Sequence, residues 1–233
     1  MNDEWGMTNL SVLNSLCICI VFCPDSHRDG KLFVTRHSSF LLQLILVSCN
    51  TKIMQATNII SSAIKKVAVL GPECTGKTDL SQYLAAYFKT EWVPEYARAF
   101  LNKLNRPYER ADLAKIAHGQ LRVEDEWMQN ANKVLICDTN LIVIKVWSEE
   151  KFGDCDPGIL TAMQARHYDL LLLTYIDIPW EADPQREHPD KREYFWNIYK
   201  KESADSKIPT IEISGAREER RKRAVEAINK ILV

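Results

Sequence analysis

The sequence predicts a three-layer α/β fold, in which a five-stranded parallel sheet lies between helices on its two faces. From Lys66 onwards, short apolar runs alternate with amphipathic segments, as expected when each strand is followed by a helix. Within the expected strand 168–174, the four residues Leu170–Leu173 form a continuous apolar run, which is typical of a strand buried on both faces of a parallel sheet. A glycine-bounded loop, residues 71–78, joins the first apolar run to the first amphipathic segment. These observations place the functional site at the carboxyl ends of the strands.

The composition is that of a globular protein with one core. The chain has 233 residues, 46% of them hydrophobic and 26% charged, enough for one domain with an extension. Lys and Arg number 30 against 31 Asp and Glu, so we expect no nucleic-acid partner. The seven cysteines lack CxxC spacing and indicate no zinc site. Reduced thiols in the cytoplasm are favoured over a disulfide framework.

Residues 1–53 differ from the rest of the chain. Two apolar runs, 10–23 and 41–47, show no clear helical or strand period, and the first is too short to span a bilayer comfortably. Asp3 and Glu4 stand where a signal peptide would carry basic residues. We expect an extension outside the functional domain, reflecting a start codon placed too far upstream, and a domain over residues 54–233. A short membrane-associating tail is the alternative, although no stable membrane association is expected.

The loop over residues 71–78 has the pattern GxxxxGK[ST] of a phosphate-binding P-loop. In such a loop, backbone N–H groups and the following helix N-terminus surround a phosphate. The lysine reaches the β- and γ-phosphate oxygens and the hydroxyl can ligate Mg²⁺. The sequence thus predicts ATP and Mg²⁺ as cofactors, with the nucleotide held by Gly71, Pro72, Glu73, Cys74, Thr75, Gly76, Lys77 and Thr78.

The next two elements lead to the expected substrate side. Residues Leu80, Tyr83, Leu84 and Tyr87 fall at helical spacing and predict a helix packed on the sheet. Residues 91–95 predict the second strand, whose carboxyl edge carries Glu95, Tyr96 and Arg98. A long helix is expected over 110–131, on which Gln120 and Glu124 face either water or the site.

The third strand, residues 133–139, ends in an acid. Asp138 is therefore a candidate to hold Mg²⁺ opposite Thr78, although Asp also commonly caps a following helix. A helix over 141–151 follows and carries Trp147. The fourth and fifth strands are expected at 168–174 and 210–213, and the fifth closes at Ser214 and Gly215. A final helix runs through Ala224, Ile228 and Ile231, with the basic run 217–223 interpreted as a solvated face.

The polar segment 180–206, between the fourth and fifth strands, is interpreted as a lid. Phosphoryl transfer needs a mobile arginine-bearing segment to neutralise charge and exclude water. Arg186 and Arg192 are the preferred pair, because guanidinium groups bind phosphate oxygens bidentately. For any one of these charges, a solvated helix face is an equally good interpretation.

With these pieces together, the sequence resembles the nicotinamide riboside kinase domain of the NadR type, a P-loop small-molecule kinase of the AAA-like ATPase superfamily. The resemblance begins near Lys65 and depends on eight segments: 71–78, 93–98, 119–120, 137–139, 145–148, 177–180, 186–189 and 213–215. No HxGH-type nucleotidyltransferase signature is present, so the expectation is of the kinase portion alone.

The resemblance implies transfer of the ATP γ-phosphoryl group to the ribose 5′-hydroxyl of nicotinamide riboside in NAD salvage. Glu95 is then the candidate general base, and Lys77, Asp138, Arg186 and Arg192 complete the catalytic set. Ser214 and Gly215 would contact the nucleotide. The substrate would be bound by Glu95, Tyr96, Arg98, Gln120 and Trp147, the last stacking on the nicotinamide ring or serving only as a buried structural tryptophan.

Three positions depart from the family pattern: Asp79, Asn140 and Tyr175. A carboxylate at Asp79 favours the helix dipole but would repel ATP phosphates if it turned inward. Two alternatives stay open, an ATP-dependent regulatory switch and a kinase of another nucleoside. The acceptor-site acid favours a kinase over a switch, since a switch does not need one.

Overall fold

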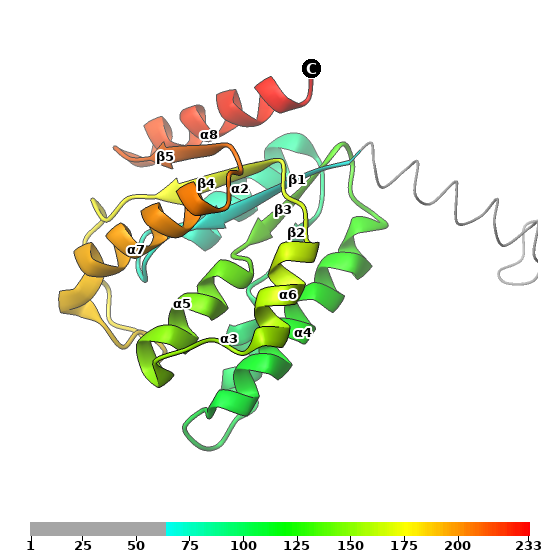
Figure 1. Cartoon of the computed structure of the whole chain (residues 1–233). Coiled ribbons are helices and arrows are strands. Elements are labelled where there is room, and N and C mark those ends of the chain that lie inside the picture. The colour runs from blue at the N-terminus through cyan, green and yellow to red at the C-terminus, as the bar shows by residue number, and fades with distance from the viewer. Residues whose placement is uncertain (1–63) are drawn as a thin grey trace, which may run out of the picture. The chain divides into compact units, whose positions relative to one another are not determined.

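The structure, a computed structural model, describes residues 64–233. The described part forms one parallel sheet of five strands in the order β2-β3-β1-β4-β5, so β1 lies at the centre. Helices pack on both faces (Figure 1). The predicted fold class, a three-layer α/β fold with a five-stranded parallel sheet, is confirmed.

Strands and helices alternate along the described chain. The strands are β1 (Lys65–Leu70), β2 (Trp92–Val93), β3 (Val134–Asp138), β4 (Leu170–Thr174) and β5 (Thr210–Ile213). The α-helices are α2 (Lys77–Phe88), α3 (Tyr96–Lys103), α4 (Arg110–Met128), α5 (Leu141–Phe152), α6 (Pro157–Ala165), α7 (Arg192–Asp205) and α8 (Arg217–Ile231), and a 3₁₀ turn, η1 (Pro189–Lys191), precedes α7.

The alternation of side chains along β1 divides the core between the two faces of the sheet. Val67 and Val69 lie on the face covered by α2 and α8, where they pack with residues such as Leu84 and Ile228. Ala68 and Leu70 lie on the other face, against side chains of α5 and α7. Helices α3, α4 and α6 pack around α5 in a further apolar cluster. The loop after β1 is therefore anchored on both sides.

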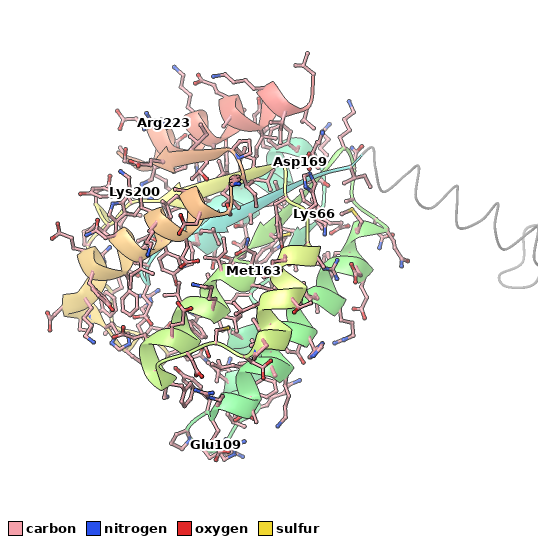
Figure 2. All side chains as sticks on the ribbon, in the orientation of Figure 1. Lys66, Glu109, Met163, Asp169, Lys200 and Arg223 are labelled. Atoms are coloured by element: carbon pink, nitrogen blue, oxygen red, sulfur yellow. The ribbon has the colours of Figure 1, made fainter. Side chains whose placement is uncertain are left out.

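Polar contacts hold β1 and β4 together at their amino ends. The Asp169 carboxylate, just before β4, accepts from the Lys66 amide at 2.9 Å and pairs with the Lys65 ammonium at 2.9 Å. Figure 2 shows Lys66 and Asp169 together at this edge. With β1 and β4 held in register there, the loops after both strands emerge side by side at the other edge.

The five predicted strands lie within a few residues of their expected bounds, and β5 coincides with its predicted range. The helices predicted between the first and fourth strands are also present, as α2, α4 and α5. Besides α7, described below, two helices were not predicted. In α3, Tyr96 begins the helix directly after a strand of only two residues, so a short extended segment obscured it. In α6, the start signal is local: Asp156 caps the helix by accepting from the Gly158 amide, and Pro157 occupies the first turn.

The segment expected to be a lid divides into two parts. Residues 181–188 are irregular, whereas α7 is a helix whose Phe195, Trp196 and Tyr199 are buried against the sheet. The prediction that the whole segment forms a lid is therefore wrong for α7. Its polar residues hid an apolar face, because Phe195 and Tyr199 are four positions apart and so lie on one side of the helix.

Between residues 64 and 233, no helix is long and apolar enough to cross a bilayer. The predictions for residues 1–53, including the upstream start and the membrane-associating tail, lie outside the described residues.

Candidate functional site

The loop after β1 has a shape that only glycine permits at two positions. Gly71 has φ +143°, and a Cβ there would lie 2.4 Å from Thr174 Oγ1 and 2.6 Å from the Thr174 carbonyl oxygen. Gly76 has φ +75° and directly precedes α2. The first glycine lets the loop pass close to β4, and the second lets the chain turn into the helix. The loop therefore has the backbone course expected of a phosphate-binding loop.

Two side chains of the loop, Lys77 and Thr75, make hydrogen bonds within it. The Lys77 ammonium donates to the Pro72 carbonyl oxygen at 2.8 Å, across the loop from its own backbone. The Thr75 hydroxyl donates to the same oxygen at 2.8 Å and lies 2.7 Å from the Thr174 hydroxyl. These bonds tie the loop to itself and to β4.

Thr78 and Asp138 meet at the carboxyl ends of β1 and β3, as predicted. The Thr78 hydroxyl donates to Asp138 Oδ2 at 2.6 Å. Burial raises the pKa of the Asp138 carboxyl, and the bond from Thr78 opposes that rise. The other carboxylate oxygen, Oδ1, is buried and has no hydrogen-bond partner among residues 64–233. An unpartnered carboxylate oxygen beside a hydroxyl fits a hydrated Mg²⁺.

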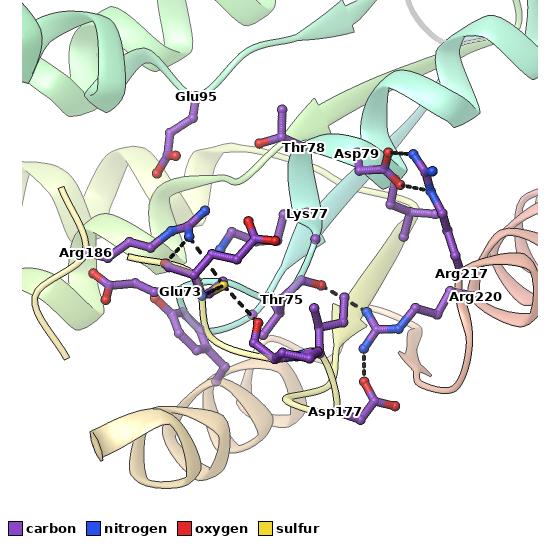
Figure 3. A pocket seen from close by; sticks show the side chains of 18 of the residues that line it. Glu73, Thr75, Lys77, Thr78, Asp79, Glu95, Asp177, Arg186, Arg217 and Arg220 are labelled. Carbon is purple, nitrogen blue, oxygen red and sulfur yellow. Dashed lines mark hydrogen bonds and ion pairs between the residues drawn. The ribbon is translucent and has the colours of Figure 1, made fainter. Parts of the chain in front are cut away.

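These groups open into a cavity of about 670 Å³ at the carboxyl edge of the sheet. Figure 3 shows it from close by. Most predicted site residues line this cavity: Gly71, Glu73, Cys74, Thr75, Gly76, Lys77, Thr78, Glu95, Arg98, Trp147, Arg186 and Gly215. Six do not line it: Pro72, Tyr96, Gln120, Asp138, Arg192 and Ser214.

Glu95 lies at the end of β2 and directly precedes α3, and it faces the cavity. Desolvation raises the pKa of its carboxyl, and the nearby Lys77 ammonium opposes that rise. Gln120 of α4 acts on this turn from behind, since its Oε1 accepts from the Tyr96 amide at 2.9 Å. Gln120 therefore positions the turn that carries Glu95, and its contact with substrate stays a prediction.

The irregular segment 181–188 is tied to the phosphate-binding loop. Glu73 accepts from the amides of Glu187 and His188, at 3.3 and 3.2 Å. The Cys74 sulfur accepts from the Glu181 amide at 3.1 Å and from Arg186 Nη1 at 3.3 Å. The segment thus lies over the cavity with Arg186 turned towards the loop.

Arg192 and Arg98 occupy different surroundings from Arg186. Arg192 donates from Nη2 to the Cys74 carbonyl oxygen at 3.0 Å, so it contacts the loop from outside the cavity. Arg98 lines the cavity and forms an ion pair with Asp183 at 3.1 Å. Of the predicted arginine pair, the structure therefore brings only Arg186 into the cavity.

Arg220 corrects the interpretation of residues 217–223 as a solvated face. Only 5% of Arg220 is exposed, and it lines the cavity together with Asp177 and Arg217. Residue 220 is one helical turn before Ala224 and two before Ile228, both buried. That spacing was the signal: Arg220 continues the buried stripe of α8, which the surrounding charges masked.

The three departures from the family pattern have visible local roles. Asp79 forms ion pairs with Arg217 and Arg221 of α8. Asn140 caps α5, since its side-chain oxygen accepts from the Ile142 amide at 2.9 Å. The Tyr175 ring packs edge-on against Trp196, with 4.8 Å between centroids.

Residues 66–220 match the family model AAA_28, described as an AAA domain, and this range holds the loop, Asp138 and Arg220. The chain belongs to this family. The resemblance inferred from the sequence is thereby confirmed at the level of the family, and two sets of similar proteins extend it.

The curated relatives are NadR proteins. The "Trifunctional NAD biosynthesis/regulator protein NadR" of Salmonella typhimurium is 30% identical over 127 residues, covering 53% of this chain and 31% of that protein. The protein of the same name from Escherichia coli is 30% identical over 129 residues, with 53% and 31% covered. This chain therefore spans about a third of the length of the curated relatives it matches.

Solved structures share the fold. A NadR protein in complex with NR superimposes with a TM-score of 0.63 at 22% identity, covering 74% of this chain and 52% of that chain. A NadR protein in complex with NAD and AMP-PNP gives 0.62 at 20% identity, with 73% and 50% covered. Thymidylate kinase from Candida albicans gives 0.53 at 12% identity, with 72% and 92% covered.

Proposed function

We propose that this protein is an ATP-dependent kinase that transfers the γ-phosphoryl group of ATP to the ribose 5′-hydroxyl of nicotinamide riboside, giving nicotinamide mononucleotide. The single observation that carries the proposal is the position of Glu95. It faces the same cavity as Lys77 and Thr78 but comes from the end of β2, on the other side of β3 from the loop. The relatives named NadR, one solved with NR bound, support this choice of acceptor.

The cavity has a separate place for each substrate. The loop after β1 lies in the middle, and the sheet order places β2 and β3 on one side of it and β4 and β5 on the other. The triphosphate would lie on the loop with its γ-phosphate towards Glu95. The rest of the nucleotide would extend towards Asp177 and Gly215, which line the opposite side of the cavity.

Glu95 would act as the general base. Its carboxylate accepts the proton of the 5′-hydroxyl while the bond from that oxygen to the γ-phosphorus forms. The bond from the γ-phosphorus to the bridging oxygen of ADP breaks, and ADP leaves with the electron pair. A carboxyl whose pKa is raised by burial is a better base than an ordinary glutamate.

Two cationic side chains would neutralise the charge on the migrating phosphoryl group. Lys77 lies at the loop and Arg186 approaches it from the segment above the cavity. Preorganised cations in a site that excludes water stabilise the charge that develops in the transition state. Arg186 is held by the Cys74 sulfur, which keeps it close to the phosphates.

Thr78 and Asp138 would hold Mg²⁺ through the hydroxyl and the unpartnered carboxylate oxygen. Among residues 64–233, no group of three or more His, Cys, Asp or Glu side chains could enclose a metal ion. That fits Mg²⁺ bound by one or two protein groups together with substrate phosphates. The bound ion would supply charge neutralisation at the phosphate oxygens.

Trp147 would lie beside the acceptor ring. It lines the main cavity and also a smaller adjoining cavity of about 250 Å³, together with Tyr108, Phe195 and Glu150. Aromatic faces and carboxylates suit a cationic ring such as that of nicotinamide. Glu150 is paired with Lys191 at 2.7 Å, and the Lys151 ammonium lies 3.4 Å from the Tyr108 ring centroid, so the choice of a cationic nucleoside depends on the relatives named NadR. Because the reaction consumes ATP, the cytoplasm is the proposed location.

A panel of nucleosides tests the proposal. The full chain is incubated with ATP and Mg²⁺, with nicotinamide riboside, thymidine, uridine, adenosine or no acceptor, and ADP release is measured. We expect release only with nicotinamide riboside, and its loss in Lys77→Ala and Glu95→Gln. Equal release with and without an acceptor would instead identify an ATPase, and a preference for another nucleoside would overturn the proposed acceptor.

A further inference from the structure

Arg220 joins three separate segments around the cavity. Its Nη1 donates to the Thr75 carbonyl oxygen at 2.9 Å, and its Nε donates to the Gly215 carbonyl oxygen at 3.0 Å. Its Nη2 donates to the Tyr175 carbonyl oxygen at 2.8 Å and to the Asp177 carboxylate. Figure 3 shows Arg220 reaching Thr75 on one side and Asp177 on the other.

All three segments lie outside the regular helices and strands, although the Tyr175 amide still donates to the Ile213 carbonyl oxygen at 2.8 Å. Thr75 belongs to the phosphate-binding loop, Tyr175 and Asp177 follow β4, and Gly215 lies in the turn between β5 and α8. Three of these acceptors line the cavity, namely Thr75, Asp177 and Gly215. Hydrogen bonds therefore contribute to their relative positions, and Arg220 donates four of these bonds.

Asp177 completes the arrangement. It accepts from the Gly215 amide at 2.6 Å and from Arg220. Although burial works against the charge, these two donors hold the pKa of the Asp177 carboxyl below its usual value. Asp177 is therefore ionised at neutral pH, and the buried guanidinium has a charged partner.

Arg220 and its hydrogen-bond partners lie on one side of the cavity only. Glu95 and Arg98 come from the region after β2, whereas the partners of Arg220 follow β1, β4 and β5. Figure 3 shows Glu95 and Arg220 on opposite sides of the loop. Given the proposed direction of the triphosphate, the Arg220 side is where the nucleoside part of ATP would lie.

We propose that Arg220 is a positioning residue for the nucleotide, which sets the phosphate-binding loop and the β5–α8 turn at the spacing that ATP or ADP requires. The inference depends on the proposed use of this cavity for ATP but not on the identity of the acceptor. A planar guanidinium with several fixed donors suits this role, and a lysine ammonium does not.

The test uses the full chain with Arg220→Lys and Asp177→Asn, and measures Mg·ADP affinity by calorimetry without any acceptor. Arg220→Lys keeps the charge but loses the planar fork, and Asp177→Asn leaves the arginine in place. We expect the dissociation constant for Mg·ADP to rise about tenfold in Arg220→Lys, as one or two lost hydrogen bonds imply. In steady-state assays, the KM for ATP should rise while the KM for the riboside stays within about twofold.

Glu124→Gln is the matched control for a purely structural effect. Glu124 is also buried; its Oε1 accepts from the Tyr168 hydroxyl at 2.8 Å, and its Oε2 lies 3.6 Å from the Lys66 ammonium. It does not line the cavity at the phosphate-binding loop. The Glu124→Gln change should lower the Tm and leave Mg·ADP affinity unchanged.

If Arg220→Lys lowers the Tm but binds Mg·ADP as the unaltered chain does, or if both KM values rise together, Arg220 is structural only. If the unaltered chain binds no nucleotide, the inference fails with the site itself, whereas normal Mg·ADP binding without riboside phosphorylation overturns only the proposed function.

Discussion

Arg217, at the start of α8, lies against Asp79, in the first turn of α2, with 3.1 Å between Arg217 Nε and Asp79 Oδ2. Arg221, one turn further along α8, approaches the same carboxylate at 3.7 Å. Asp79 directly follows Thr78 and lines the cavity, so its charge faces the proposed phosphate site. The Asp79 carboxylate, which the sequence analysis expected to repel ATP phosphates if it turned inward, is thus neutralised by Arg217 and Arg221 of α8.

This pairing makes the two residues interdependent for nucleotide affinity. Arg217→Gln exposes the Asp79 charge and should weaken ATP binding about two- to fivefold, the size expected of a partly exposed ion pair. Asp79→Thr in the Arg217→Gln background should restore the affinity. A double-mutant cycle on Mg·ADP affinity at low and high salt measures the coupling. Additive effects of the two changes would show that the ion pair has no bearing on the nucleotide.

Glu95→Gln separates proton abstraction from binding. Removing the base should lower kcat about 10²- to 10⁴-fold, while Mg·ADP affinity changes little. In the unaltered chain, activity should fall as the pH drops through the pKa of Glu95, since a protonated carboxyl cannot accept the hydroxyl proton. Because burial raises that pKa, the loss should begin at a higher pH than for an exposed glutamate. A pH–rate profile that keeps the same acid limb in Glu95→Gln would assign the limb to another group.

Asp138→Asn tests the proposed Mg²⁺ site. The change removes the charge of the unpartnered oxygen but keeps an acceptor for the Thr78 hydroxyl. The Mg²⁺ concentration that gives half-maximal activity should rise about 10- to 100-fold. Asn140→Ser, two residues along, keeps a capping oxygen for α5 and serves as the control, with no expected change in Mg²⁺ dependence. The same Mg²⁺ response in Asp138→Asn and in the unaltered chain would exclude Asp138 as a ligand.

Asp112 should govern the stability of α4 in a pH-dependent way. Its buried carboxylate accepts from Arg106 at 2.7 Å, from the Glu109 amide at 3.0 Å and from Lys115 at 3.0 Å. Arg106 foremost holds the pKa of Asp112 well below its usual value. The stabilisation is therefore present above the unfolded-state pKa of about 3.9 and is lost as the pH falls further.

Asp112→Asn should accordingly lower the Tm at pH 7, and the difference from the unaltered chain should shrink below about pH 4. Thermal unfolding followed by circular dichroism over this range measures both. A Tm difference that is constant with pH would assign the effect to packing instead of charge.

The strands and the phosphate-binding loop could be predicted from the sequence because their sequence patterns are local. Four apolar residues in a row at β4 and the glycine spacing at Gly71 and Gly76 depend only on neighbouring positions. Asp138 could be placed opposite Thr78 because parallel strands bring their carboxyl ends to one edge. The placement of Asp138 opposite Thr78 thus followed from the parallel arrangement of the strands.

The rest of the site depends on contacts between distant parts of the chain. Arg220 lies in a run of charged residues, and only its partners Thr75, Tyr175 and Asp177, at least 43 positions away, distinguish it from a solvated arginine. Gln120 likewise acts on the Glu95 turn from 24 positions away along the chain. Local patterns do not report such pairings, so the burial of Arg220 and the contact of Gln120 with this turn could not be predicted.

The most direct test of the proposed phosphoryl transfer is its stoichiometry. The full chain is given ATP, Mg²⁺ and a limiting amount of nicotinamide riboside, and ADP and nicotinamide mononucleotide are quantified together by chromatography. We expect one ADP for each nicotinamide mononucleotide formed, with both ceasing when the riboside is consumed. Continued ADP production after the riboside is exhausted, or ADP without nicotinamide mononucleotide, would contradict the proposed reaction.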